Sequence, residues 1–143
     1  MTLDELARSM VLQASQRMKV LPILLQDGAY SVVVRESQEV AELSLKALLR
    51  LCGVEPPKIH DVGRHLLAHR EKAAALGIDN VESLAAASQS LRKERELSFY
   101  GEADFIPTEA YTPAQAEEAL GLAHACLTAA QLALSRASGN VIS

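Results

Sequence analysis

The segment from residue 29 to residue 51 constrains the fold of this chain more than any other part of it. It reads AYSVVVRESQEVAELSLKALLRL. The turn sequence QDG precedes it, and Cys52-Gly53 and then a proline pair follow it. Its apolar residues recur along two stripes of a helical wheel and occupy more than half of the circumference. A helix with two apolar stripes lies between neighbouring helices, so this segment predicts a bundle.

Four other segments show helical periodicity, and none shows a convincing strand pattern. The five predicted helices span residues 2–26, 29–51, 61–76, 79–99 and 112–137, and residues 101–111 show no periodicity. Capping boxes at Thr2–Glu5, Asp79–Glu82 and Thr112–Gln115 predict three of the helix starts. Gly77 is expected to end the third helix, and Pro22 is expected to kink or interrupt the first.

Length and composition agree with one helical domain. The 143 residues are 49% hydrophobic but only 3% aromatic, and their apolar mass is Leu, Ala and Val, which favours helices over an aromatic-rich sheet. The connections are short. We therefore predict an all-α fold, an up-and-down bundle of four to five helices. Residues 1–143 form a single domain in this interpretation, with a core from about residue 2 to residue 137 and a frayed C-terminal tail.

Charge and hydropathy exclude several classes of function. The net charge of −4, from 14 basic and 18 acidic residues, argues against a surface that coats nucleic acid and leaves room only for a local basic patch. No apolar run is long enough to span a bilayer, and no signal peptide is visible. We expect a cytoplasmic protein without a membrane partner. Cys52 and Cys126 are expected to be buried free thiols.

Four charged residues of the central segment fall on one narrow strip of its helix. Arg35, Glu39, Glu42 and Lys46 lie within about 60° of one another at 100° per residue. Glu42 precedes Lys46 by four residues, the favourable orientation for an ion pair. The strip is either a solvent-exposed seam or a polar strip at a groove or a subunit interface.

The same region resembles a known family. The sequence GAYSVVVRESQEVAELSLKALLRLCGVEPPKIHDVGRHL is similar to the start of a HEPN domain, and LRKERELSFYGEADFIPTEAYTPAQAEEAL is similar to its second half. The residues that match the family pattern in the first part are Tyr30, Gln38, Glu42, Lys46, Ala47, Leu48, Leu49, Gly53, Pro56, Pro57 and His60. The resemblance covers about residues 5 to 135. It implies a bundle of four or five helices that is often a homodimer.

Many HEPN proteins are metal-independent ribonucleases, and this chain departs from their signature. The signature is an Arg followed after four to six residues by a His at the end of the fourth helix. The resemblance puts Arg95 at the Arg position, but Tyr100, Gly101 and Glu102 occupy the places for His. A Tyr with a pKa of about 10 is a poor base at neutral pH. A ribonuclease toxin that uses Arg95 with Tyr100 in place of His is therefore an alternative interpretation.

The pairing of Arg95 with Tyr100 resembles the HEPN proteins that are commonly encoded beside a small nucleotidyltransferase. The resemblance implies that the chain is the helical partner of such an enzyme in a two-component, toxin–antitoxin-like system, with nucleotide or RNA binding. The ligand-binding residues that it implies are Gln38, Glu42, Lys46, Arg95 and Tyr100. A third interpretation is a helical interaction protein without a ligand. No cofactor is expected.

The histidines give two weaker signals. The sequence RHLLAH matches the ribonuclease signature formally, but Arg64 and His69 lie about 140° apart on a helix. His65 and His69 have the spacing of metal ligands, and Asp61 extends it, yet no credible further ligand lies nearby, so we expect no metal site. His124 is expected to be a hydrogen-bonded core or interface histidine.

Overall fold

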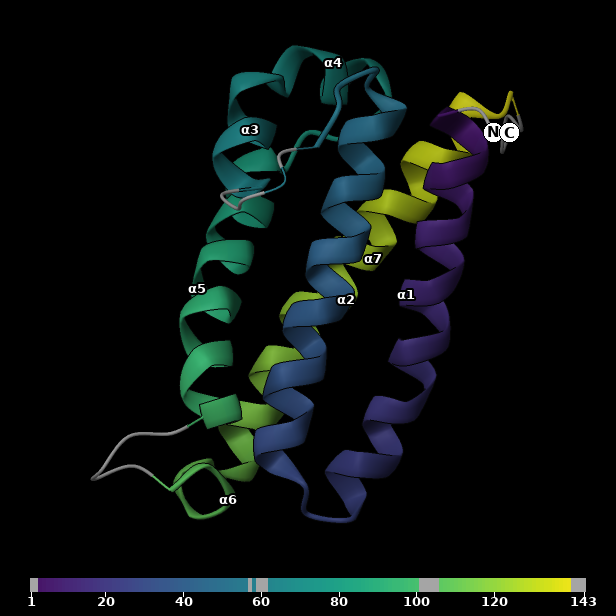
Figure 1. Ribbon diagram of the computed structural model, residues 1–143. Helices are drawn as coiled ribbons and strands as arrows, with labels where there is room; N and C mark the ends of the chain where they lie inside the picture. Colours follow the sequence, from purple (N-terminus) through teal and green to yellow (C-terminus); the bar gives the residue numbers. More distant parts are fainter. Residues whose placement is uncertain (1–2, 57, 59–61, 101–105, 140–143) are drawn as a thin grey trace.

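The computed structural model describes residues 3–56, 58, 62–100 and 106–139, and the side chains of these residues except 3–4 and 95–100. The described residues form helices and no strand. The helices are α1 (Leu3–Gln26), α2 (Tyr30–Leu51), α3 (Val62–Ala68), α4 (Arg70–Ala75), α5 (Val81–Tyr100), α6 (Pro107–Ala110) and α7 (Pro113–Ala137). The long helices α1, α2, α5 and α7 run alternately down and up (Figure 1). The predicted all-α, up-and-down bundle is confirmed.

The local signals at two helix ends have the predicted consequences. The hydroxyl of Thr112 accepts a hydrogen bond from the backbone N–H of Gln115 at 3.2 Å, and Gln115 Oε1 accepts one from the backbone N–H of Thr112 at 2.9 Å. This is the predicted capping box of α7. Gly53 follows the C-cap of α2 with a φ of +81°, which glycine adopts at low cost.

The helices differ from the prediction in three places. α1 ends at Gln26 as predicted, but Pro22 does not interrupt it, because buried Leu21 anchors this stretch while Pro22 itself is exposed and leaves its missing hydrogen bond on the solvent side. The helix predicted for 61–76 is two helices that meet at His69, whose N–H is shared between two carbonyls, 3.2 Å from His65 O and 3.1 Å from Leu66 O.

The third difference is the short helix α6, which lies in the stretch without periodicity because a single turn is too short to show any. It begins at Pro107, whose fixed φ suits a first helical position.

α5 begins at Val81, so the residue before it is Asn80 rather than the expected cap Asp79. The expected cap Thr2 and the proposed ligand Asp61 lie outside the described residues.

Helix α2 is the centre of the bundle and contacts α1, α5 and α7 (Figure 1). Its two apolar stripes belong to two separate core clusters. Leu45 and Leu48 pack into a cluster with α3, α5 and α7, whereas Val40 and Ala47 pack into a cluster with α1 and α7. The prediction that this helix lies between neighbours is therefore confirmed. The alanines of α7, many of which are buried, allow its close approach to α2.

Helix α3 fixes the first half of α5. A Cβ atom added to Gly63 of α3 would lie 3.0 Å from both the Cα and the carbonyl oxygen of Ala85, so the two backbones touch at this point. Leu84 and Leu91 of α5 are both buried in the core cluster with α2. Helix α5 is thus held from Val81 to Leu91.

Among the residues that the structure describes, no helix has the length and hydropathy that a membrane span requires.

Candidate functional site

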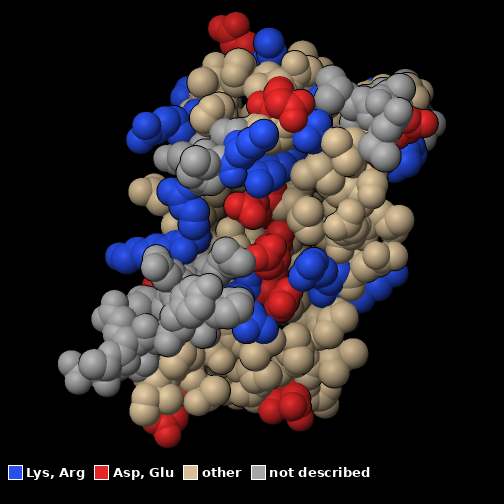
Figure 2. Space-filling model, viewed as in Figure 1, with Lys and Arg blue, Asp and Glu red and all other residues tan. Residues whose placement is uncertain are grey.

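The charged strip of α2 lies on the surface of the bundle. Arg35 and Glu36 have side chains that are 31% and 25% exposed, and Glu39, Glu42 and Lys46 are half-buried. In Figure 2, acidic side chains form a column over α2 in the middle of the face shown, with Lys and Arg on both sides of it. Helix α7 covers the opposite side of α2 (Figure 1). The strip therefore crosses a face where a ligand or a partner has access.

The ion pairs of α2 differ from those that the sequence predicted. Glu36 pairs with Arg17 of α1 at 2.9 Å and lies 3.8 Å from Arg35. The predicted pair between Glu42 and Lys46 is not among the ion pairs of the described residues. Arg17 of α1 lies closer to Glu36 than Arg35 of α2 does, so the carboxylate of Glu36 joins α2 to α1. Glu42 and Lys46 keep their charges on the open face.

Gln38 contrasts with the other residues of the predicted site because it is buried. Its side chain is 4% exposed, and its Oε1 has no hydrogen-bond partner in the described structure. It lies one helical turn after Val34 and one turn before Glu42, at the edge where the core meets the strip. A buried amide oxygen without a partner costs about 1–3 kcal/mol.

The other two predicted site residues lie near the end of α5. Their side chains are outside the described part of the structure, so only their helical positions are known. Arg95 follows buried Leu91 by one turn, which puts its position on the side of α5 that faces α2. Because α5 continues to Tyr100, the positions of Arg95 and Tyr100 are about 140° apart around the helix axis. One helix face cannot carry both residues.

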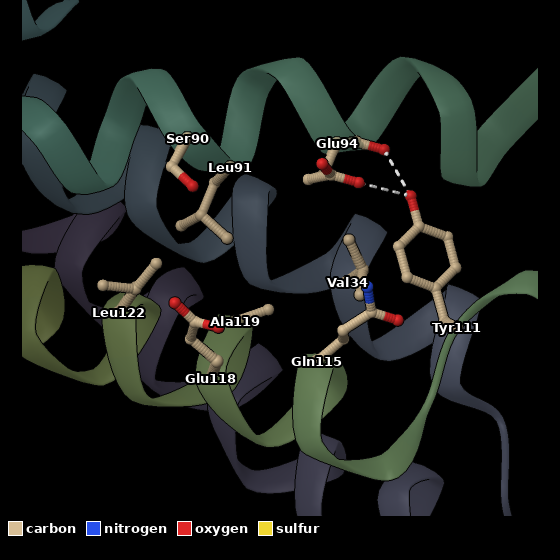
Figure 3. A pocket seen from close by; sticks show the side chains of 9 residues that line it. All are labelled: Val34, Ser90, Leu91, Glu94, Tyr111, Gln115, Glu118, Ala119 and Leu122. Carbon is tan, nitrogen blue, oxygen red and sulfur yellow. Dashed lines mark hydrogen bonds between the residues drawn. The ribbon is translucent and has the colours of Figure 1, made fainter.

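A pocket of about 130 Å³ lies between α5 and α7, close to the start of α7 (Figure 3). Its apolar wall includes Leu91 and Leu122, and its polar wall includes Glu94, Glu118 and Tyr111. Two carboxylates disfavour a phosphate, and no Lys or Arg is among the lining residues whose side chains the structure describes. The chemistry of this pocket thus differs from that of the strip on α2.

A tyrosine of this pocket makes the strongest polar contact near the end of α5. The hydroxyl of Tyr111 lies 2.8 Å from the carboxylate of Glu94 and 3.1 Å from the backbone carbonyl oxygen of the same residue (Figure 3). The Tyr111 side chain is only 8% exposed. Burial and the bond to Glu94 raise the pKa of Tyr111 well above its ordinary value, so the phenol remains a hydrogen-bond donor at neutral pH.

The cysteines and histidines do not form a reactive centre in the described structure. Both cysteines are free thiols; Cys126 is buried and Cys52 is half-buried. Burial raises the pKa of the Cys126 thiol to about 12 and also raises that of Cys52, so neither is activated as a nucleophile. His124 is exposed on α7, so the core alternative of its prediction was wrong, and the interface alternative stays a prediction. The described residues contain no group of three or more potential metal ligands.

The comparisons with known proteins identify the family. The model of the HEPN domain family matches residues 7–133, which is most of the chain. No curated protein and no solved structure shows a significant match. The fold is the four-helix, up-and-down arrangement described above, and the chain belongs to the HEPN domain family.

Sequence reasoning missed the contact between Tyr111 and Glu94. Both residues lie in the stretch that resembles the second half of a HEPN domain, and the sequence indicated no role for either of them. The distance between them along the chain is 17 residues, so no helical spacing relates them. The one available signal for the position of Tyr111 was the capping box at Thr112, because it fixes the start of α7 directly after Tyr111.

Proposed function

We propose that this HEPN protein is the helical partner of a nucleotidyltransferase in a two-component, toxin–antitoxin-like system in the cytoplasm, and that it binds nucleotide or RNA along α2 and the end of α5. The ligand residues in this proposal are Gln38, Glu42, Lys46, Arg95 and Tyr100. Membership of the family supports the general role. The departure of the chain from the ribonuclease signature supports a binding role over catalysis.

One observation carries the choice of site: the buried, unpartnered oxygen of Gln38 beside the half-buried charges of Glu42 and Lys46. An exposed seam that served only solubility would have no reason to keep a buried amide without a partner at its edge. Nucleobases carry amino groups that donate to an amide oxygen, and they reach the buried oxygen of Gln38 if its side chain rotates toward the strip on ligand binding. Lys46 and Arg95 supply positive charge for a phosphate.

The chemistry of Tyr100 argues against the ribonuclease alternative. A phenol of ordinary pKa does not accept a proton efficiently at neutral pH, so Tyr100 is a poor replacement for the His of the signature. Incubating the protein with total RNA in the presence of EDTA tests this alternative directly. Cleavage that is lost in Arg95→Ala would establish it against the binding role proposed here.

The substitution Gln38→Leu gives the sharpest test of the site. Removing the unpartnered amide should leave the free energy of unfolding unchanged or raise it, because the buried polar cost disappears. The same substitution should weaken binding of a short single-stranded RNA or of a nucleotide in calorimetry. Lys19→Gln, on the exposed surface of α1, is the control. Wild-type protein that binds neither ligand and does not co-purify with a co-expressed neighbouring nucleotidyltransferase refutes the proposal.

We also propose that the chain forms a homodimer. Leu12 and Ile23 are 57% and 66% exposed, and they are about 20° apart on the outer face of α1. Large apolar side chains on one exposed helix face are typical of an interface. Light scattering should give twice the mass of 15.4 kDa, and Leu12→Glu with Ile23→Lys should give the monomer mass. A wild-type monomer over the micromolar range contradicts this part of the proposal.

A further inference from the structure

The end of α5 is held differently from its beginning. From Val81 to Leu91 this helix is packed against α2 and α3, with a backbone contact at Ala85 and buried leucines on the inner side. After Leu91, none of the α5 side chains that the structure describes is buried. The contact between Glu94 and Tyr111 ties this part of α5 to the start of α7.

Tyr111 is itself a rigid anchor. Its ring is 8% exposed, and it belongs to the core cluster with α2 and α5. The next residue, Thr112, is the N-cap of α7 and is locked by two hydrogen bonds to Gln115. On the other side, α6 contacts both α2 and α5. The phenol therefore points at α5 from a fixed place at the start of α7.

The phenol reaches the backbone of α5 as well as a side chain. Its oxygen lies 3.1 Å from the carbonyl oxygen of Glu94 and 2.8 Å from the carboxylate of that residue. A single hydroxyl proton shared between two oxygens of one residue restrains that residue in rotation and in translation. Arg95 is the next residue of the same helix, so the restraint acts directly beside the proposed phosphate contact.

We propose that Tyr111 is the positioning residue of the ligand site: its hydrogen bonds to Glu94 fix the turn of α5 that carries Arg95 against α2. This rests on the proposed function of Arg95 and extends it to a residue outside the ligand set. The raised pKa of Tyr111 agrees with the role, because the phenol keeps its proton throughout the neutral range. Tyr111 does not touch the ligand.

Hydrogen exchange tests the restraint without any ligand. Tyr111→Phe keeps the buried ring and removes only the hydroxyl, so the fold should persist while amide exchange after residue 94 rises by about tenfold, the effect of one lost bond to a charged group. Glu94→Gln keeps an acceptor oxygen and should retain the slow exchange. Tyr30→Phe is the matched control, since Tyr30 is a half-buried tyrosine at the start of α2. Unchanged exchange in Tyr111→Phe overturns the proposal.

A double-mutant cycle tests the positioning role itself. Tyr111→Phe should weaken binding of a short single-stranded RNA by about fivefold in the wild-type background and by nothing in Arg95→Ala, because the hydroxyl acts only through that residue. Equal losses in both backgrounds, or no loss in either, overturn the proposal. If wild-type protein binds no RNA or nucleotide, the proposed function fails, and faster exchange would then show a structural tie without a positioning role.

Discussion

The two sides of α2 differ in burial and in charge, and only the inner side contributes to the core of the bundle. The inner side carries Leu45, Leu48 and Leu49, which have no exposed surface, and it packs into a continuous core. The outer side carries half-buried charges that the core does not need. The apolar contacts that stabilise the fold therefore lie on the inner side, which a ligand cannot reach. Substitutions on the outer side should change the free energy of unfolding much less.

The largest expected effect comes from the inner side. Leu48→Ala removes a fully buried side chain and leaves a cavity between α2, α5 and α7, so the free energy of unfolding should fall by about 2–5 kcal/mol. Urea denaturation followed by circular dichroism measures it. Lys46→Ala, two residues earlier on the outer side, should change the same quantity by no more than about 0.5 kcal/mol. Similar losses for the two variants would remove the distinction between the sides.

The next largest effect on the free energy of unfolding is expected at the C-terminal end of α2, where Arg50 forms an ion pair with Glu55. Arg50 is 16% exposed, and its guanidinium donates to both carboxylate oxygens of Glu55 at 3.1 and 3.3 Å. Glu55→Ala leaves a largely buried cation without this partner and should cost about 1–2 kcal/mol. Glu71→Ala, an exposed glutamate on α4, serves as its control in thermal unfolding. A loss of stability no larger than that of the control would show that the pair between Arg50 and Glu55 does not stabilise the fold.

Substitution of either of two buried serines on the inner side of α2 is expected to raise the free energy of unfolding instead of lowering it. Ser37 and Ser44 have no exposed surface, and their hydroxyl oxygens have no hydrogen-bond partner in the described structure. Replacing either with Ala removes an unsatisfied polar atom and improves helix propensity, so the free energy of unfolding should rise by about 0.5–1 kcal/mol. Chemical denaturation measures the gain. A clear loss in Ser44→Ala would mean that the hydroxyl has a partner such as a bound water.

The sequence predicted the long helices well because each of them exceeds five turns, and periodicity is strong over that length. It could not predict the break at His69 or the single turn at Pro107, since both depend on how short segments close against the bundle. Of the site, the strip on α2 follows from helical geometry alone. The burial of Gln38 and the bond between Tyr111 and Glu94 do not, because both depend on how the helices pack against one another.

The smallest effect on stability should accompany a clear effect on binding. Glu42→Gln with Lys46→Gln removes two of the four charges of the strip, keeps the net charge at −4, and should change the free energy of unfolding by no more than about 0.5 kcal/mol. Binding of a short single-stranded RNA should weaken, and its dependence on salt should decrease as a phosphate contact of Lys46 is lost. Glu71→Gln with Lys72→Gln on α4 makes the same charge change at an exposed place outside the strip. If the two double variants bind alike, the outer side of α2 is only a solvated seam, and the ligand role must be sought elsewhere on the bundle.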